Sequence, residues 1–201
     1  MLTMKYALYY GNRGFFPASL IAGAREDLPR ALKAAGHQFI QMDAGVTRAG
    51  AVETPEEGRK YAEFLAQNRG KYDGVILSLP NFGDETGAVA ALRDAGVPIL
   101  VQAYPDEMDK MGPATRRDSF CGKLSVMDVF HQNGIPFTAL APHTVHPSHA
   151  RLKDNLGYFD RLCRVVRAGR RMTVGALGAR TTPFRTVRID ELALEKHGIT
   201  V

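Results

Sequence analysis

Four stretches of the sequence repeat one pattern: a helix-like segment, then a glycine, then a short apolar run. They read ALKAAGHQFIQMD, ALRDAGVPILVQAY, VFHQNGIPFTAL and ALEKHGITV, with the glycines at Gly36, Gly96, Gly134 and Gly198. Glycine adopts the left-handed conformation that ends many helices at little cost. An apolar run after it is typical of a strand buried on both faces of a parallel sheet. The pattern therefore predicts a chain of alternating helices and strands.

The bounds of these elements follow from apolar spacing and from helix caps. Strands are predicted at 4–10, 38–43, 73–80, 98–104 and 137–143. Helices are predicted at 18–35, at 54–68 with a Thr cap and a Pro in the first turn, in a short segment ending at Asp94, at 119–133 and at 149–168. This alternation predicts an α/β fold, a flavodoxin- or Rossmann-like doubly wound parallel sheet of about five strands.

A new unit is predicted after this sheet. The run RMTVGALG at 171–178 resembles a fresh strand, and a helix is expected from about Arg185 to Lys196, before Gly198 and the apolar residues ITV. One βα unit cannot bury a core of its own. We therefore expect an N-terminal α/β domain at 1–170, and at 171–201 the first βα unit of a second α/β domain that is interrupted there.

Composition narrows the class of protein. With 45% hydrophobic and 23% charged residues, the chain has the balance of a globular protein. No run of about 18 apolar residues is present, so no membrane partner is predicted. The first residues do not resemble a secretory signal, and a cytoplasmic location is expected. Cys121 and Cys163 belong to no C-x-x-C pair, and both are predicted to be buried thiols.

The net charge of +5 comes largely from arginines such as those in RLCRVVRAGRR at 161–171. These arginines fall on the polar side of an amphipathic helix and are not interleaved with aromatic residues. No nucleic-acid partner is predicted for this reason. A solvent-exposed face or a subunit contact explains the basic residues better.

Ligands of open α/β sheets bind beyond the carboxyl ends of the strands. The loop after the first strand, GNRGFFPAS, lacks the usual P-loop, flavin and dinucleotide patterns. It does contain Arg13, whose fork of N–H donors suits a carboxylate, a phosphate or the vicinal hydroxyls of a sugar. The alternative is that Arg13 pairs with a nearby acid, while Phe15 and Phe16 pack under the loop.

The loop after the third strand, LPNFGDETG, combines polar groups with an aromatic ring. Asn81, Asp84 and Glu85 surround Phe82, an arrangement in which sugars are often held. The alternative is that Asp84 or Asn81 caps the following helix. Asn81 and Phe82 are therefore candidate sugar contacts.

The two later loops give weaker indications. Residues 104–123 form a long, charged connection that could contact a partner subunit, but the acidic pattern of a calcium loop is missing. His143, His146 and His149 are three residues apart, yet prolines break any helix that would align them for zinc, so helix capping explains them better. No metal ligand and no catalytic residue is predicted in this chain.

Several stretches together resemble one family. The segments RRDSFCGKLSV, NGIPFTALAPHTVHP, LCRVVRAGRRMTVGALGARTTPFRTVR and DELALEKHGITV, with GNRGFFP near the start, are similar to the N-terminal part of the L-fucose/L-arabinose isomerase-like proteins. The resemblance implies an enzyme that interconverts an aldose and a ketose through an enediol, with a divalent metal, typically Mn²⁺, polarising the sugar oxygens.

The resemblance also implies where the chemistry lies. In this family two N-terminal α/β domains precede a C-terminal domain, and the metal ligands and catalytic histidine lie beyond the region represented here. The first domain helps to close the active site of a neighbouring subunit in a homo-oligomer. Arg13 matches the opening-loop arginine that reaches the sugar, and Asn81 and Phe82 follow from loop position. His146 stands where relatives are expected to have an acidic residue.

Two functions follow as expectations. In the first, the chain is the N-terminal fragment of a metal-dependent sugar isomerase and supplies scaffold, subunit contacts and part of the substrate site, so that it is inactive alone. In the second, it is a free-standing α/β module that binds a small sugar without catalysis. Calorimetric titration with a panel of sugars separates them, because tight binding by the chain alone favours the module.

Overall fold

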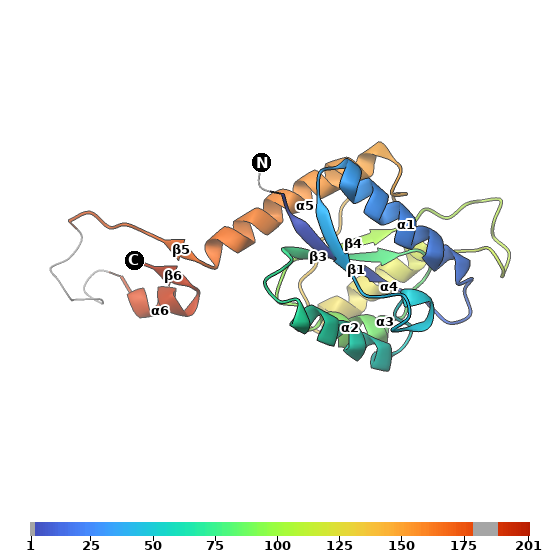
Figure 1. The fold of residues 1–201 in the computed structure, drawn as a ribbon, viewed down its shortest axis with the longest axis horizontal. Coiled ribbons are helices and arrows are strands. Elements are labelled where there is room, and N and C mark those ends of the chain that lie inside the picture. Colours follow the sequence, from blue (N-terminus) through green and yellow to red (C-terminus); the bar gives the residue numbers. More distant parts are fainter. Residues whose placement is uncertain (1–2, 179–188) are drawn as a thin grey trace.

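The computed structural model describes residues 3–178 and 189–201 and contains a parallel sheet of four strands (Figure 1). The strands are β1 (Lys5–Tyr10), β2 (Gln38–Gln41), β3 (Gly74–Leu79) and β4 (Ile99–Ala103). Their order across the sheet is β2-β1-β3-β4. This is the start of the flavodoxin-like order, and the predicted Rossmann-like α/β class is confirmed.

Helices cover both faces of this sheet. On one face α1 (Ser19–Ala34) and α5 (Ala150–Gly169) pack on Tyr6 and Leu8 of β1. On the other face α2 (Pro55–Gln67), α3 (Glu85–Leu92) and α4 (Ser119–Gln132) pack on Tyr9 of β1 and on Leu77 of β3. Alternate residues of a strand point to opposite faces, so a strand with helices on both sides must be apolar throughout. That requirement explains the continuous apolar runs in the sequence.

The glycines of the repeated pattern adopt the predicted conformation. Gly36, Gly96, Gly134 and Gly198 have φ angles of 82°, 65°, 65° and 80°, in the left-handed region. The predicted Thr cap also forms, since the Thr54 hydroxyl accepts a hydrogen bond of 3.2 Å from the N–H of Glu57.

The fifth predicted strand, at 137–143, is reduced to one bridge between Leu100 and Thr138. The N–H of Thr138 donates to the Ile99 carbonyl at 2.7 Å, and the Thr138 carbonyl accepts from the N–H of Val101 at 3.0 Å. The segment therefore lies beside β4, where a fifth strand belongs. Pro136, two residues before Thr138, lacks the N–H that would extend the ladder in that direction.

Residues after 170 form a small separate group at the end of α5 (Figure 1). Here β5 (Met172–Thr173) pairs in parallel with β6 (Ile199–Thr200), and α6 (Glu191–Lys196) precedes β6. The first residues of the helix predicted from Arg185 lie outside the described residues. The division of the chain into domains at 1–170 and 171–201 stays a prediction.

Two further predictions concern burial. Cys163 is buried as predicted, but Cys121 is exposed, because it falls on the outward side of the first turn of α4.

Among the residues that the structure describes, no helix is long and apolar enough to cross a membrane.

Candidate functional site

The candidate site lies where the loops after β1 and β3 meet at the carboxyl edge of the sheet. β1 and β3 are neighbours, and the chain leaves them in different directions, toward α1 and α3. Gly11 and Gly83 let the two loops approach closely, since a Cβ at either position would come within 2.8 or 2.6 Å of a Leu79 methyl carbon. Such a switch point is where open α/β sheets bind ligands.

Arg13 comes from the first loop and contacts two residues of the third. Its Nη2 donates to Glu85 Oε2 at 3.0 Å, and its guanidinium carbon lies 4.6 Å from the centre of the Phe82 ring. The Arg13 side chain remains 31% exposed and that of Glu85 17% exposed. The alternative that Arg13 pairs with a local acid is therefore confirmed. The pairing still leaves part of the guanidinium open to solvent above a half-buried aromatic ring.

Asn81 lies at the same point but is fully buried. Its Oδ1 accepts from the N–H groups of Arg13, at 3.3 Å, and Gly83, at 3.1 Å, while its Nδ2 donates to Asn12 Oδ1. All of these partners belong to the two loops. In this geometry Asn81 joins the loops and sets the backbone of Arg13, without reaching solvent itself.

The polar network continues into the segment before α2. Asn12 is also fully buried, and its Nδ2 donates to Glu53 Oε1. The second oxygen of Glu53 pairs with Arg48 Nη1 at 3.0 Å. Arg48 belongs to a 3-10 turn (Arg48–Gly50) that follows β2. Three loops at the carboxyl edge are thus tied together by side chains.

The third loop is set by caps and by close packing. The Asp84 carboxylate accepts from the N–H of Gly87 at 2.7 Å, which confirms the alternative that Asp84 caps α3. On the other side, a Cβ on Gly122 of α4 would lie 1.9 Å from the Phe82 carbonyl oxygen. Only a glycine allows α4 to approach Phe82 this closely, so α4 fixes the backbone position of Phe82.

The two phenylalanines after Arg13 differ in their exposure to solvent. Phe16 is buried and lies 5.5 Å below the guanidinium carbon of Arg116, so it packs under the loop as the alternative stated. Phe15 is 69% exposed, and its ring contacts that of Phe16 at 4.8 Å between centroids.

The long connection between β4 and α4 adds two more arginines to this edge. Arg117 donates to the Pro80 carbonyl at 3.0 Å and to Glu107 at 3.3 Å, while Arg116 pairs with Asp118 at 3.4 Å. Hydrogen bonding from Lys110 and then from Arg117 lowers the pKa of Glu107. Burial raises the pKa of Tyr104, beneath Arg117, well above its ordinary value, so its phenol stays protonated.

Ser125 of α4 also joins the network, since its Oγ donates to Glu85 Oε1 at 2.6 Å. Sequence reasoning did not identify Asn12, Arg48, Glu53 or Ser125, although all four belong to the network at this edge. Asn12 directly precedes Arg13, and its place in the same loop could have indicated it. Arg48, Glu53 and Ser125 lie in other segments, and no spacing along the chain relates them to Arg13.

The histidines of the fifth loop are not brought together for a metal. His149 Nδ1 accepts from the N–H of Arg151 at 3.1 Å and caps α5, as the alternative stated. His146 lies 3.6 Å from Asp27 and edge-on to the Tyr104 ring. Within residues 3–178 and 189–201, no three His, Cys, Asp or Glu side chains are grouped so that they could hold a metal ion.

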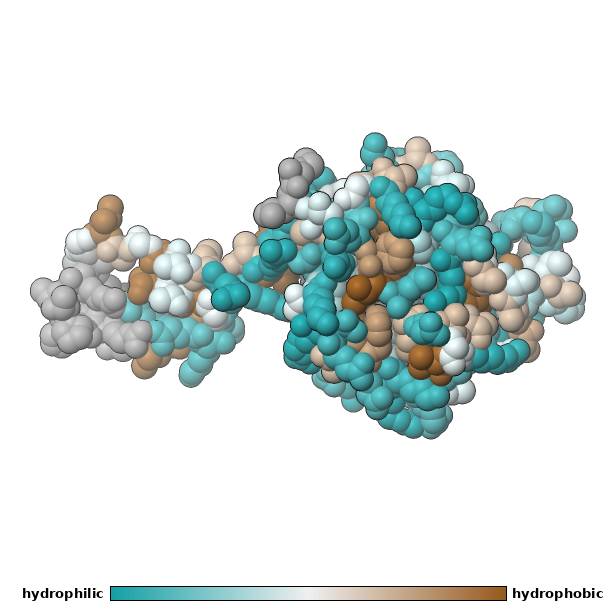
Figure 2. Space-filling view, in the orientation of Figure 1, coloured by the Kyte–Doolittle hydropathy of each residue, from teal (hydrophilic) through white to brown (hydrophobic). Residues whose placement is uncertain are grey.

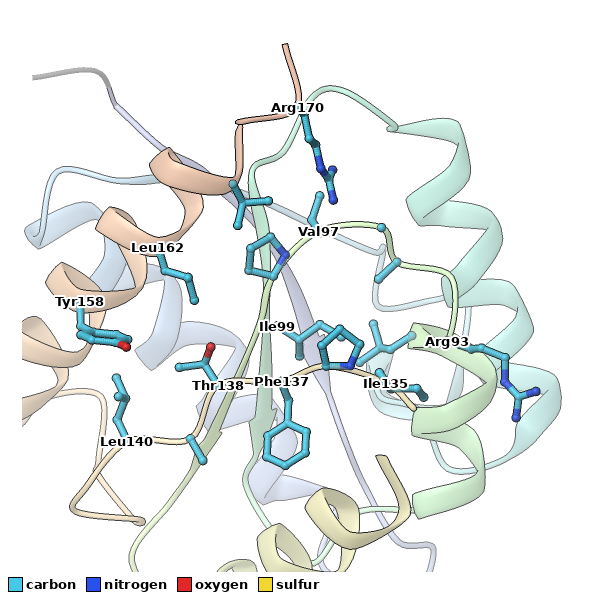
Figure 3. Close-up of a pocket in the computed structure, with 17 residues that line it drawn as sticks. Arg93, Val97, Ile99, Ile135, Phe137, Thr138, Leu140, Tyr158, Leu162 and Arg170 are labelled. Atoms are coloured by element: carbon cyan, nitrogen blue, oxygen red, sulfur yellow. The ribbon is translucent and has the colours of Figure 1, made fainter. Parts of the chain in front are cut away.

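A separate groove of about 690 Å³ lies at the other end of β4 (Figure 3). Its walls are mainly apolar, with Leu140, Tyr158 and Leu162 facing Phe137 and Ile99. It contains none of the predicted site residues. The carboxyl edge around Arg13 is therefore the candidate site.

Comparison with known protein families identifies a match over most of the chain. The family model for the N-terminal domain of fucose/sulfoquinovose isomerase matches residues 7–170 of this chain. No curated protein matches the chain.

Proposed function

Since the chain belongs to the family of fucose/sulfoquinovose isomerase N-terminal domains, we propose that it forms part of the sugar site of a metal-dependent aldose–ketose isomerase of the L-fucose/L-arabinose type. In this proposal the domain supplies scaffold, subunit contacts and a substrate-binding arginine. Membership of a sugar isomerase family implies a small sugar as substrate.

The observation that carries the proposal is the presentation of Arg13 over Phe82 at the carboxyl edge. A guanidinium has five N–H donors in a fixed plane and can bind two neighbouring hydroxyls of a sugar at once. An aromatic face beside it suits the apolar C–H side of a sugar ring. We assign the direct contacts to Arg13 and Phe82, and we assign to Asn81 the task of holding Arg13's loop, because the Asn81 side chain is buried.

The charge balance at this edge supports an uncharged sugar. Four arginines at the edge each pair with a carboxylate: Arg13 with Glu85, Arg48 with Glu53, Arg116 with Asp118 and Arg117 with Glu107. An anionic sugar would bind best to an exposed cation without a carboxylate partner, and none of these four arginines is one. A neutral aldose such as L-fucose or L-arabinose fits these paired groups better.

The residues at this edge do not fit a metal site. Glu53 and Glu85 already accept hydrogen bonds from Arg, Asn and Ser side chains, and the described part of the chain offers no suitable cluster of ligands. We propose that the Mn²⁺ of such an isomerase, together with the groups that move the proton, is held by residues outside this chain.

Exposed apolar side chains near the candidate site support a homo-oligomer. Phe15, Met108 and Met111 lie in the loops of the carboxyl edge, and Phe120 lies in the first turn of α4. All four are at least 43% exposed. We propose that this edge faces the active site of a neighbouring subunit, and that the enzyme acts in the cytoplasm.

One experiment tests the proposal against a free-standing sugar-binding module. The purified 201 residues, given Mn²⁺ and either L-fucose or L-arabinose, should form no ketose and bind both sugars weakly. Ketose formation would contradict the placement of the catalytic groups outside this chain. Tight binding in a calorimetric titration without turnover would favour the module.

A further inference from the structure

Arg13 is held from outside its own loop. Its Nη2 donates to Glu85 Oε2 at 3.0 Å, and the other oxygen of Glu85 accepts from Ser125 Oγ at 2.6 Å. Glu85 belongs to the first turn of α3 and Ser125 to α4. A carboxylate with a donor on each oxygen has a fixed orientation, so the direction of the Arg13 side chain depends on two helices.

The two helices are themselves closely packed. A Cβ on Gly58 of α2 would come 2.4 Å from the carbonyl oxygen of Gly87 in α3, and Gly122 gives α4 the same close approach to Phe82. Glu85 also lies at the amino end of α3, where the helix dipole stabilises a carboxylate. The backbone positions and the charge of Glu85 are thus both well determined.

This arrangement leaves donors of Arg13 for a ligand. In the described part of the chain, only Nη2 of the guanidinium has a hydrogen-bond partner, and the guanidinium lies over the Phe82 ring. An arginine that is already ordered loses less side-chain freedom when a ligand binds. Removing the partner that orders it should therefore weaken binding even though that partner never touches the ligand.

We propose that Glu85, oriented by Ser125, is a positioning residue that fixes the guanidinium of Arg13 for the sugar. The proposal rests on the proposed function, in which Arg13 contacts the sugar. Ser125 acts on Glu85, Glu85 acts on Arg13, and neither needs to touch the substrate.

A double-mutant cycle in the isomerase, with L-fucose as substrate, tests the coupling. Glu85→Gln should raise KM about 10-fold and Ser125→Ala about 3-fold, with kcat within about 2-fold, because an interaction present in both ground and transition states affects KM alone. Arg13→Ala combined with Glu85→Gln should be no worse than Arg13→Ala alone. The proposal would be overturned if the KM increase of the double variant equalled the product of the two single increases. An unchanged KM for Glu85→Gln would also overturn it.

The matched control is Glu56→Gln on the outer face of α2. Glu56 also pairs with an arginine, Arg59 at 2.6 Å, but its side chain is 69% exposed and, in the described part of the chain, forms no hydrogen bond with Arg13, Glu85 or Ser125. Its neutralisation should leave KM and kcat unchanged. A KM increase equal to that of Glu85→Gln would show that loss of any carboxylate produces the effect.

A second measurement separates this proposal from the function on which it rests. In the sugar-free protein, the NMR signal of the Arg13 Nε–H group should report an ordered side chain that becomes mobile in Glu85→Gln and in Ser125→Ala. If Arg13→Ala leaves KM unchanged, the proposed sugar contact is wrong, whatever the NMR result. If the Arg13 signal is equally ordered in all three proteins, Glu85 does not position Arg13.

Discussion

Single residues at the carboxyl edge decide whether the loops meet. Gly122 is the sharpest case, because the Phe82 carbonyl occupies the space of its missing side chain. Gly122→Ala should destabilise the fold by about 1–3 kcal/mol, the usual effect of overpacking. Urea unfolding measures this.

Gly157→Ala in the middle of α5 is the matched control. A Cβ at this position would have the Arg161 Nη1 atom, 3.9 Å away, as its only neighbour within 4 Å among the described residues. Alanine stabilises a helix interior relative to glycine by about 0.5–1 kcal/mol. Equal stability of the Gly122→Ala and Gly157→Ala variants would contradict the close packing of α4 on Phe82.

A buried lysine beside the site makes stability depend on pH. Lys123 is 2% exposed, and its Nζ donates to the His143 carbonyl at 2.8 Å. Burial lowers the pKa of Lys123 to about 8. From pH 8 up to its ordinary pKa of about 10.4, the unfolded chain therefore binds more protons than the folded one, and the folded state gains stability as the pH rises.

The variant Lys123→Met lacks this titration. The free energy of unfolding of the wild type minus that of Lys123→Met should rise from pH 8 to pH 9.5, by at most about 1.4 kcal/mol per pH unit. Urea unfolding of both proteins at pH 7, 8, 9 and 9.5 gives the difference, in which other titrating groups cancel. A difference that is constant or falls over this range would rule out a lowered pKa for Lys123.

At the scale of elements, the sequence predicts a helix or strand wherever the residues that determine it are close together in the chain. The glycines of the repeated pattern, the Thr54 cap and the apolar runs of β1 to β4 act over a few residues, and each predicted its element. Contacts between loops were different. Arg13 and Glu85 are 72 residues apart and Asn12 and Glu53 are 41 apart, so no spacing along the chain reveals them.

The segment 137–143 at the edge of the sheet shows that local composition can also predict too much structure. The apolar composition of 137–143 predicted a full strand, but only Thr138 exchanges hydrogen bonds with β4. Apolar composition indicates burial, whereas a ladder also needs N–H groups in register with the carbonyls of the neighbouring strand, and Pro136 has none. Within 137–143 Thr138 alone exchanges backbone hydrogen bonds with β4, and beyond this segment the N–H of Val145 donates to the Ala103 carbonyl at 2.8 Å.

Amide hydrogen exchange tests this account of the edge. The amide of Thr138, bonded to the Ile99 carbonyl, should exchange more slowly than those of Phe137 and Ala139, and the central strand β3 should exchange slowest of all. Uniform protection from 137 to 143 would mean that a complete fifth strand forms in solution.

At the scale of the whole molecule, the two parts of the chain differ in how well they bury apolar residues. In the group after residue 170, Met172, Val174, Leu177, Ile189 and Leu192 are between 41% and 101% exposed. Figure 2 shows brown, hydrophobic residues on this small group, beside a larger body with mostly hydrophilic surface. Such exposure agrees with the prediction that residues 171–201 form the first βα unit of a second α/β domain.

The proposed function depends on contact between Arg13 and a sugar, in an isomerase of which this domain is a part. Its most direct test is the KM for L-fucose of the isomerase carrying Arg13→Ala, beside the control Arg151→Ala, whose exposed arginine pairs only with Asp154 in the described part of α5. Loss of hydrogen bonds from a charged donor predicts a KM about 10- to 100-fold higher for Arg13→Ala, and an unchanged KM for the control. An unchanged KM for both variants would contradict the claim.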